Sequence, residues 1–241
     1  MSDLSGSPMD GKRPKREKVL EASNLVVGRP GNGKHPGFRV RPGSFSLSVG
    51  EIILLSGDNG TGKTTILSCL AGLIVPVAGQ VLVEGESLYG VFGARTRLRR
   101  KVAFVAADPY LFRGTLLDNV IYGLKSRNVG RSQAVRLGLE ALEQAGLADF
   151  ASKPARSLSR GQVRRVAVIR AAILEPRILL LDEPDSDLDA PGRQWLLDLI
   201  QGFSARTAVL VSTHASGELA AAAHRVLSVR GGLEGKVHLG E

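Results

Sequence analysis

The most informative stretch of this 241-residue chain is Gly57-Asp58-Asn59-Gly60-Thr61-Gly62-Lys63-Thr64. It fits the phosphate-binding pattern G-x-x-x-x-G-K-[ST]. The apolar run 52–56 precedes it, as expected of a strand buried in a parallel sheet, and residues 64–73 look like the following helix. Glycines let backbone N–H groups turn toward an anion, and a helix start attracts the same anion. We therefore predict a phosphate site over this stretch and the adjoining Thr65, the alternative being a glycine-rich turn in an unrelated unit.

The side chains of this stretch match a second motif further along the chain. Lys63 would reach the β- and γ-phosphates of a nucleotide, and the hydroxyl of Thr64 would complete a Mg²⁺ shell. The apolar run 178–181 ends in Asp182 and Glu183. A buried strand delivers such carboxylates to its C-terminal end, where ligands bind in open α/β sheets. Asp182 would hold Mg²⁺, directly or through water, and Glu183 would polarise the attacking water, so that Lys63 and Glu183 are predicted catalytic residues.

The remaining pattern predicts an α/β fold with a mainly parallel sheet. A helical insertion is expected over about 109–165, with Val135, Leu139 and Leu142 on one helix face and Ser132 as an N-cap. The alternation in 44–49 is typical of a half-buried antiparallel strand. Further strands are predicted at 19–27, 81–85, 102–106 and 208–212, a loop at 28–43 and a helix at 161–174.

Composition limits the class of protein. Hydrophobic content of 43% and charged content of 23% are typical of a soluble globular chain, and no apolar run is long enough to span a bilayer. Part of the formal net charge of +9 lies in a basic tail, residues 1–18, which we predict to be disordered. An acidic partner such as nucleic acid or an anionic membrane is the alternative explanation of that charge. The single cysteine, Cys69, excludes a disulfide within the chain and reads as a core residue.

Three further motifs place the phosphate loop in a family context. Residues 158–162 read Leu-Ser-Arg-Gly-Gln and resemble the LSGGQ signature of ABC (ATP-binding cassette) ATPases. Residues 186–189 resemble the D-loop of that family, and His214 stands after a strand, as its switch histidine does. The resemblance covers about 19–230. It implies a P-loop NTPase (RecA-like) core with a small antiparallel β subdomain and a helical insertion subdomain, as one domain over 19–241.

The resemblance also implies how the site is completed. Members of this family pair head to tail, so that the phosphate loop of one subunit faces the signature of the other, with ATP and Mg²⁺ between them. Carried over, Ser159, Gly161 and Gln162 would contact the nucleotide of the partner subunit. His214 would hydrogen-bond the γ-phosphate and act as a third catalytic residue. A plain helix N-cap is the structural alternative for Ser159, and both roles can hold together.

Some positions depart from the family pattern. Ala107 stands where the family usually has Gln, and alanine cannot coordinate a metal or hydrogen-bond through its side chain. We expect slower hydrolysis or altered coupling, with Asp108 as a substitute. The usual adenine-stacking aromatic is missing, so that Arg29 or Phe38 would take its place. Asp185 replaces the usual Thr, for which the sequence offers no physical explanation.

A single cassette without membrane spans resembles the separate ATPase subunits of ABC transporters, and this resemblance implies a transporter subunit. It would hydrolyse ATP as a cytoplasmic protein, peripheral on the inner face of the cell membrane, with membrane permease subunits and a second ATPase subunit in a homodimer or heterodimer. Import is slightly favoured, with a solute-binding protein as an added partner, because residues 121–124 resemble small-anion importers. A non-transport ABC ATPase acting on nucleic acid or ribosomes is the alternative. A degenerate, non-hydrolysing partner in a heterodimer is a third hypothesis, against which the complete set of catalytic residues argues.

Overall fold

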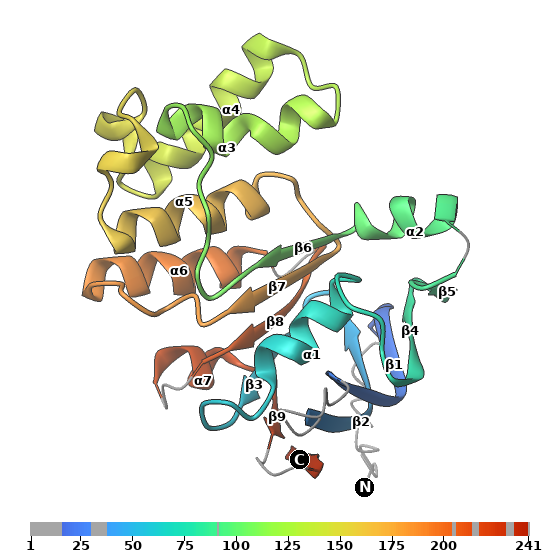
Figure 1. Ribbon diagram of the computed structural model, residues 1–241. Helices are drawn as coiled ribbons and strands as arrows, with labels where there is room; N and C mark the ends of the chain where they lie inside the picture. The colour runs from blue at the N-terminus through green and yellow to red at the C-terminus, as the bar shows by residue number, and fades with distance from the viewer. Residues whose placement is uncertain are drawn as a thin grey trace, which may run out of the picture.

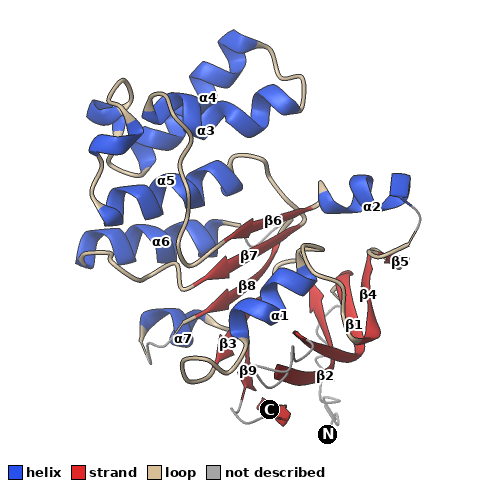
Figure 2. Ribbon diagram, in the orientation of Figure 1, coloured by secondary structure: helices blue, strands red, loops and turns tan. Residues whose placement is uncertain are grey.

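The computed structural model describes residues 16–29, 38–90, 92–203, 206–213, 217–229 and 234–240. This part of the chain forms a ten-stranded mixed sheet in the order β5-β4-β1-β2-β10-β9-β3-β8-β7-β6, with helices on both sides (Figure 1, Figure 2). The strands are β1 (Lys18–Arg29), β2 (Phe38–Ser48), β3 (Ile52–Ser56), β4 (Ala78–Val83), β5 (Glu86–Ser87), β6 (Val102–Val105), β7 (Ile178–Asp182), β8 (Ala208–Ser212), β9 (Arg225–Val229) and β10 (Glu234–Gly240). The α-helices are α1 (Lys63–Leu70), α2 (Phe92–Arg99), α3 (Leu116–Ser126), α4 (Arg131–Gln144), α5 (Arg160–Ala172), α6 (Ala190–Gly202) and α7 (Glu218–Ala222).

The parallel half of the sheet carries the predicted motifs. β3 pairs in parallel with β8 and β9, and β7 pairs in parallel with β6 and β8. Side chains of β3 alternate between two cores: Ile53 and Leu55 pack with α1, whereas Ile52 and Leu54 pack in the core that includes α5 and α6. This two-sided burial explains the continuous apolar run, as predicted. Because the strands are parallel, their carboxyl ends meet at one edge of the sheet.

The antiparallel half extends further than expected. β1 pairs antiparallel with β2 and with β4, and β4 pairs antiparallel with β5. The predicted loop 28–43 is wrong at both of its ends, since β1 continues to Arg29 and β2 begins at Phe38; residues 30–37 lie outside the described part. In β2 the exposed Arg39 and Arg41 flank the buried Val40, which is the alternation of a half-buried strand. The glycines and basic residues of 28–43 are typical of a loop, so that the sequence did not indicate this alternation.

The helical insertion has its own small core. Figure 1 shows α3 and α4 above α5, away from the sheet. Gly138 of α4 packs against α3, and a Cβ at that position would lie 2.5 Å from the Cγ2 of Ile121. The face predicted for α4 is therefore rotated: Ala134, Gly138 and Leu142 are buried, whereas Leu139 is 42% exposed. The prediction that Ser132 caps α4 is also wrong.

The N-cap of α4 is Gly130, and no side-chain hydrogen bond caps the helix. Ser132 follows Arg131, the first residue of α4, so that it stands within the first turn. α4 therefore begins without a side-chain cap.

Three smaller predictions concern the N-terminal tail, the end of α1 and the burial of Cys69. Most of the predicted tail 1–18 lies outside the described residues, but Arg16 donates to the backbone oxygen of Gly50 (3.0 Å), and β1 already begins at Lys18. α1 ends at Leu70 rather than 73, because Gly72 follows with φ 72°. Cys69 is buried in the core, as predicted. Within the described ranges, none of the helices is long and apolar enough to cross a membrane.

Candidate nucleotide site

The predicted phosphate loop connects β3 to α1 at the carboxyl edge of the sheet (Figure 1). Gly62 is the N-cap of α1 with φ 101°, and a Cβ there would lie 2.4 Å from the Cγ2 of Val40. Only glycine fits this left-handed, crowded position. Lys63 is buried, and its Nζ donates to the backbone oxygens of Gly57 (2.6 Å) and Asp58 (3.1 Å). The loop is therefore folded around its own lysine.

The electrostatic surroundings of Lys63 are mixed. Burial lowers the pKa of its ammonium group, while the nearby carboxylates of Glu183, Asp182 and Asp58 oppose that shift. Burial is the larger of these effects. An anionic ligand that reached Lys63 would add a further negative charge and favour the charged form of the side chain.

Asp182 is held at the end of β7 by two hydroxyl groups. The Oγ1 of Thr64 donates to its Oδ2 (2.7 Å), and the Oγ of Ser212 donates to its Oδ1 (2.6 Å). Asp182 is fully buried and stands opposite Ser212 in the β7–β8 register. The structure thus brings together the two residues predicted to hold a metal. Ser212 was not among the predicted site residues, although its place at the end of a predicted strand was a usable signal.

Glu183 follows directly in a constrained conformation. Its φ is 47°, a left-handed value that is uncommon for a residue other than glycine. Its backbone N–H donates to the backbone oxygen of Ser212 (3.0 Å) and lies 3.1 Å from the Oγ of Ser212. A cavity of about 240 Å³ lies over the phosphate loop, and Glu183 lines it together with Lys63, Thr64 and Phe38. Phe38, one of the two adenine-stacking candidates, therefore stands at this cavity, whereas the side chain of Arg29 lies outside the described part.

The signature residues stand apart from this cavity. Ser159 is the N-cap of α5, where its Oγ accepts from the N–H of Gln162 (3.3 Å) and its own N–H donates to Oε1 of Gln162 (2.9 Å). The predicted N-cap is therefore confirmed as a capping box. Figure 1 shows the start of α5 well away from the start of α1, and neither Ser159 nor Gly161 lines the cavity over the phosphate loop.

The predicted switch histidine, His214, lies outside the described residues. Its neighbour Thr213 is buried, and the Oγ1 of Thr213 donates to Oδ2 of Asp185 (2.6 Å). The unexplained Asp185 therefore anchors the end of β8 to the segment after β7. A threonine hydroxyl at position 185 could also accept this bond, but without the charge assistance that a carboxylate gives.

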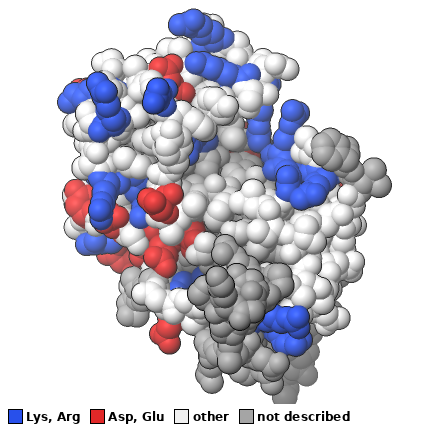
Figure 3. Space-filling model, in the orientation of Figure 1, with Lys and Arg blue, Asp and Glu red and all other residues white. Residues whose placement is uncertain are grey.

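The other acidic residues after β7 also have partners. Asp187 lies 3.4 Å from the Nη2 of Arg164, and Asp189 caps α6 by accepting from the N–H of Gly192 (3.0 Å). Asp189 also pairs with Arg165 (3.3 Å). Figure 3 shows acidic side chains with basic ones between them at this end of the molecule. Two carboxylates of the acidic stretch, Asp187 and Asp189, are thus paired with arginines of α5, which the sequence alone did not indicate.

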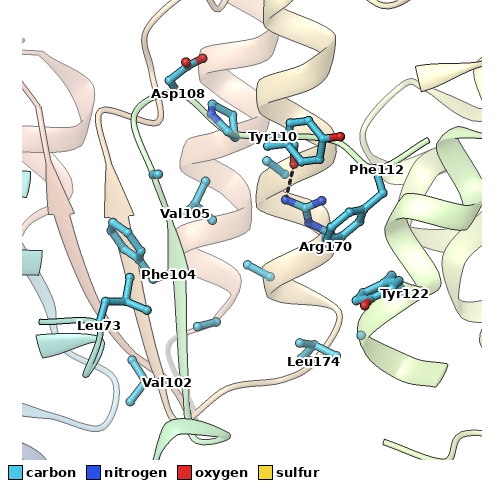
Figure 4. A pocket seen from close by; sticks show the side chains of 16 residues that line it. Leu73, Val102, Phe104, Val105, Asp108, Tyr110, Phe112, Tyr122, Arg170 and Leu174 are labelled. Atoms are coloured by element: carbon cyan, nitrogen blue, oxygen red, sulfur yellow. Dashed lines mark hydrogen bonds between the residues drawn. The ribbon is translucent and has the colours of Figure 1, made fainter. Parts of the chain in front are cut away.

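A larger cavity of about 560 Å³ lies between β6, α5 and α3 (Figure 4). Its rim is aromatic: Tyr110 and Phe112 meet edge to face at 5.9 Å, and Phe112 lies 4.6 Å from Tyr122. Arg170 stands 5.2 Å over the ring of Phe112 and donates to the backbone oxygen of Tyr110 (2.9 Å). Asp108 also lines this cavity and not the one over the phosphate loop.

Comparisons with known proteins agree with this geometry. A family model described as ABC transporter matches residues 40–186. The energy-coupling factor transporter ATP-binding protein EcfA of Methanosphaera stadtmanae is 33% identical over 81% of this chain and 70% of its own length. The cobalt import ATP-binding protein CbiO of Rhodobacter capsulatus is 36% identical over 89% of this chain and 76% of its own length.

Solved structures show the same fold. A dimeric bacterial ABC transporter cassette superposes with a TM-score of 0.80 at 25% identity, over 88% of this chain and 94% of that one. A dimeric post-hydrolysis cassette bound to ADP and Pi gives a TM-score of 0.77 at 26% identity, over 87% and 94%. The family match, the relatives and the fold lead to one assignment. This chain belongs to the ABC transporter family, as one of its ATPase cassettes.

Proposed function

We propose that this cassette binds and hydrolyses Mg-ATP as the energy-coupling subunit of a membrane transporter. The observation that carries the proposal is the contact of Thr64 with Asp182 beside Lys63, at the rim of the cavity that Glu183 lines. A hydroxyl and a carboxylate oxygen suit Mg²⁺, which takes few protein ligands and completes its shell with phosphates and water. Within the described part of the chain, no group of three or more His, Cys, Asp or Glu could hold a metal, and such a Mg²⁺ site needs none. When bound, the ion neutralises phosphate charge.

The residues of this chain would act in stages. An incoming phosphate replaces the carbonyls of Gly57 and Asp58 as the partner of Lys63 and makes stronger, charge-assisted hydrogen bonds to its ammonium group. Thr64 and Asp182 would hold Mg²⁺ through the Thr64 hydroxyl and Oδ2 of Asp182, while Ser212 would keep its hydrogen bond to Oδ1 of Asp182. Glu183 accepts a hydrogen bond from the water that attacks the γ-phosphate. Phe38 offers its ring to the base, and His214 contacts the γ-phosphate.

A second subunit would complete this site. Ser159 is exposed at the start of α5, where backbone N–H groups and the positive end of the helix favour an anion. Ser159 does not line the cavity over the phosphate loop of its own chain, which leaves it available to the nucleotide of a partner. The dimeric cassettes among the solved relatives support this arrangement. Ser159, Gly161 and Gln162 are thus proposed to contact the nucleotide that the partner subunit binds.

The aromatic cavity supports a membrane partner. Tyr110 and Tyr122 are 69% and 54% exposed, and Leu73, which also lines the cavity, is 58% exposed. Exposed apolar groups gathered at one hollow mark an interaction site. We assign it to a permease segment, with the chain on the cytoplasmic face of the membrane.

Import remains the preferred direction. The names of several relatives include energy coupling, cobalt import and Fe(3+) import, although one relative is named for peptide export. Neither the relatives nor the structure adds support for a role on nucleic acid or ribosomes. A solute-binding protein would be a further partner of an importer.

The experiment that tests this function compares Thr64→Val with Thr207→Val. Both changes remove a hydroxyl without changing the side-chain volume. Thr207 lies just before β8, at the end of this strand opposite to Ser212. Its hydroxyl donates to the backbone oxygen of Pro176 (2.6 Å), and its backbone oxygen accepts from the N–H of Gly50. We expect Thr64→Val to reduce the ATPase rate at fixed Mg²⁺ by about tenfold or more, with part of the loss recovered at high Mg²⁺. Thr207→Val should leave the rate and its Mg²⁺ dependence unchanged. A Thr64→Val variant with the Mg²⁺ dependence of the wild type would refute the proposed metal site.

A further inference from the structure

Arg164, on α5, is a buried arginine to which the motifs give no role. It is 6% exposed, and its Nη1 donates to the backbone oxygen of Ala107 while its Nη2 lies 3.4 Å from Oδ2 of Asp187. The Nε of Arg164 is buried without a hydrogen-bond partner among the described residues. A buried charge is stable only where its partners stay in place. One guanidinium therefore ties the segment after β6 and the segment after β7 to the same helix.

A backbone contact reinforces the connection to Asp187. Gly161 stands three residues before Arg164, and a Cβ there would lie 2.7 Å from the backbone oxygen of Asp187. Asp187 itself has φ 60°, a left-handed value that its surroundings must impose. The first turns of α5 thus hold the conformation of Asp187 both by close packing and by charge.

Each of the two segments that Arg164 connects borders one of the two cavities. Ala106, Asp108 and Pro109 line the aromatic cavity, and Ala107, which stands among them in the chain, lacks the side chain that the family uses there. The segment with Asp187 begins at Glu183, which lines the cavity over the phosphate loop. We propose that Arg164 is a positioning residue for ATP hydrolysis, which transmits the position of the segment around Ala107 to Glu183 through Asp187. This inference rests on the proposed function.

The test is a double-mutant cycle on the full chain with Arg164→Gln, Asp187→Asn and the double variant. We expect Arg164→Gln to lower kcat for ATP hydrolysis by about tenfold with KM for ATP within about twofold, because positioning acts on the reacting state and not on binding. Asp187→Asn should have a smaller effect, and the double variant should be no slower than Arg164→Gln, since both changes break one connection. Arg164→Lys, which keeps the charge, should be intermediate.

Arg177→Gln is the matched control. Arg177 is also a partly buried arginine with two carboxylate partners, Glu17 (2.6 Å) and Glu84 (3.0 Å), but it precedes β7 at the end opposite to Glu183. The Arg177→Gln change should lower the melting temperature and leave kcat and KM for ATP at 25 °C unchanged. Additive effects in the cycle, or a normal kcat in Arg164→Gln with only a lower melting temperature, would overturn the inference alone. A wild-type chain without ATPase activity would refute the proposed function and the inference with it.

Discussion

At the scale of single residues, the site is organised around Asp182. Both of its carboxylate oxygens accept hydrogen bonds from hydroxyl groups, so that a fully buried charge remains satisfied. The hydroxyl of Thr64 comes from the phosphate loop and that of Ser212 from the neighbouring strand. A ligand that draws Thr64 away therefore leaves the carboxylate still anchored on one side. This arrangement suits a group that must exchange partners without leaving its place.

Ala107 gives a prediction at this scale. Ala107→Gln restores an amide that can hydrogen-bond the attacking water or the metal shell. One such bond contributes about 1 kcal/mol, so we expect the ATPase rate to rise by about fivefold. The measurement is steady-state phosphate release, and Lys63→Ala in the same background should abolish it. An unchanged rate in Ala107→Gln would show that the missing side chain does not limit hydrolysis.

At the scale of elements, the antiparallel strands are joined to the parallel sheet by an ion-pair cluster. Glu84, which follows β4, contacts Lys101 just before β6 and Arg177 just before β7 (3.0 Å). Arg177 also pairs with Glu17, just before β1. The hydrogen bond from Lys101 lowers the pKa of Glu84 the most; burial opposes this shift, and Arg177 adds to it. The cluster therefore stabilises the attachment of one half of the sheet to the other.

This cluster predicts a pH-dependent difference in stability. Because the pKa of Glu84 is lower in the folded chain, its contribution is complete above its unfolded pKa of about 4.3 and is lost as the pH falls through the folded value. Glu84→Gln should lower the free energy of unfolding at pH 7 by about 1 kcal/mol, or the melting temperature by about 2–4 °C. The difference from the wild type should shrink below pH 4.3 in thermal melts. A difference that stays constant down to pH 3 would contradict the role of the charge.

The helices and strands also show how much of the fold can be predicted from the sequence. The buried runs 52–56 and 178–181 and the loop between strand and helix follow from local spacing, and all appear as predicted. The early start of β2 at Phe38 could not be predicted, since only pairing with β1 makes its basic residues part of a strand. The bonds of Asp185 and Arg164 were equally hidden, because they join segments that meet only in the folded chain. Local chemistry is thus readable, whereas contacts between distant segments are not.

At the scale of the whole molecule, the two cavities and the start of α5 are arranged for separate partners. The cavity over the phosphate loop is lined by the residues proposed for ATP, and the aromatic cavity between β6, α5 and α3 is lined by a separate set of residues. α5 reaches from the exposed Ser159 to Arg170 at the aromatic rim (Figure 4). One helix therefore connects the surface proposed for a second cassette with the surface proposed for a permease.

The most direct test of this account is the size of the Glu183→Gln variant with Mg-ATP, measured by light scattering after gel filtration. Removing the carboxylate should stop hydrolysis and trap ATP, so that the chain runs as a dimer of about twice its 25.6 kDa. Adding Ser159→Asp keeps a good N-cap but sets a negative charge against the γ-phosphate, and should return the variant to a monomer, whereas the neutral Ser159→Asn should not. A Glu183→Gln chain that stays monomeric and hydrolyses ATP at the wild-type rate would contradict the shared site.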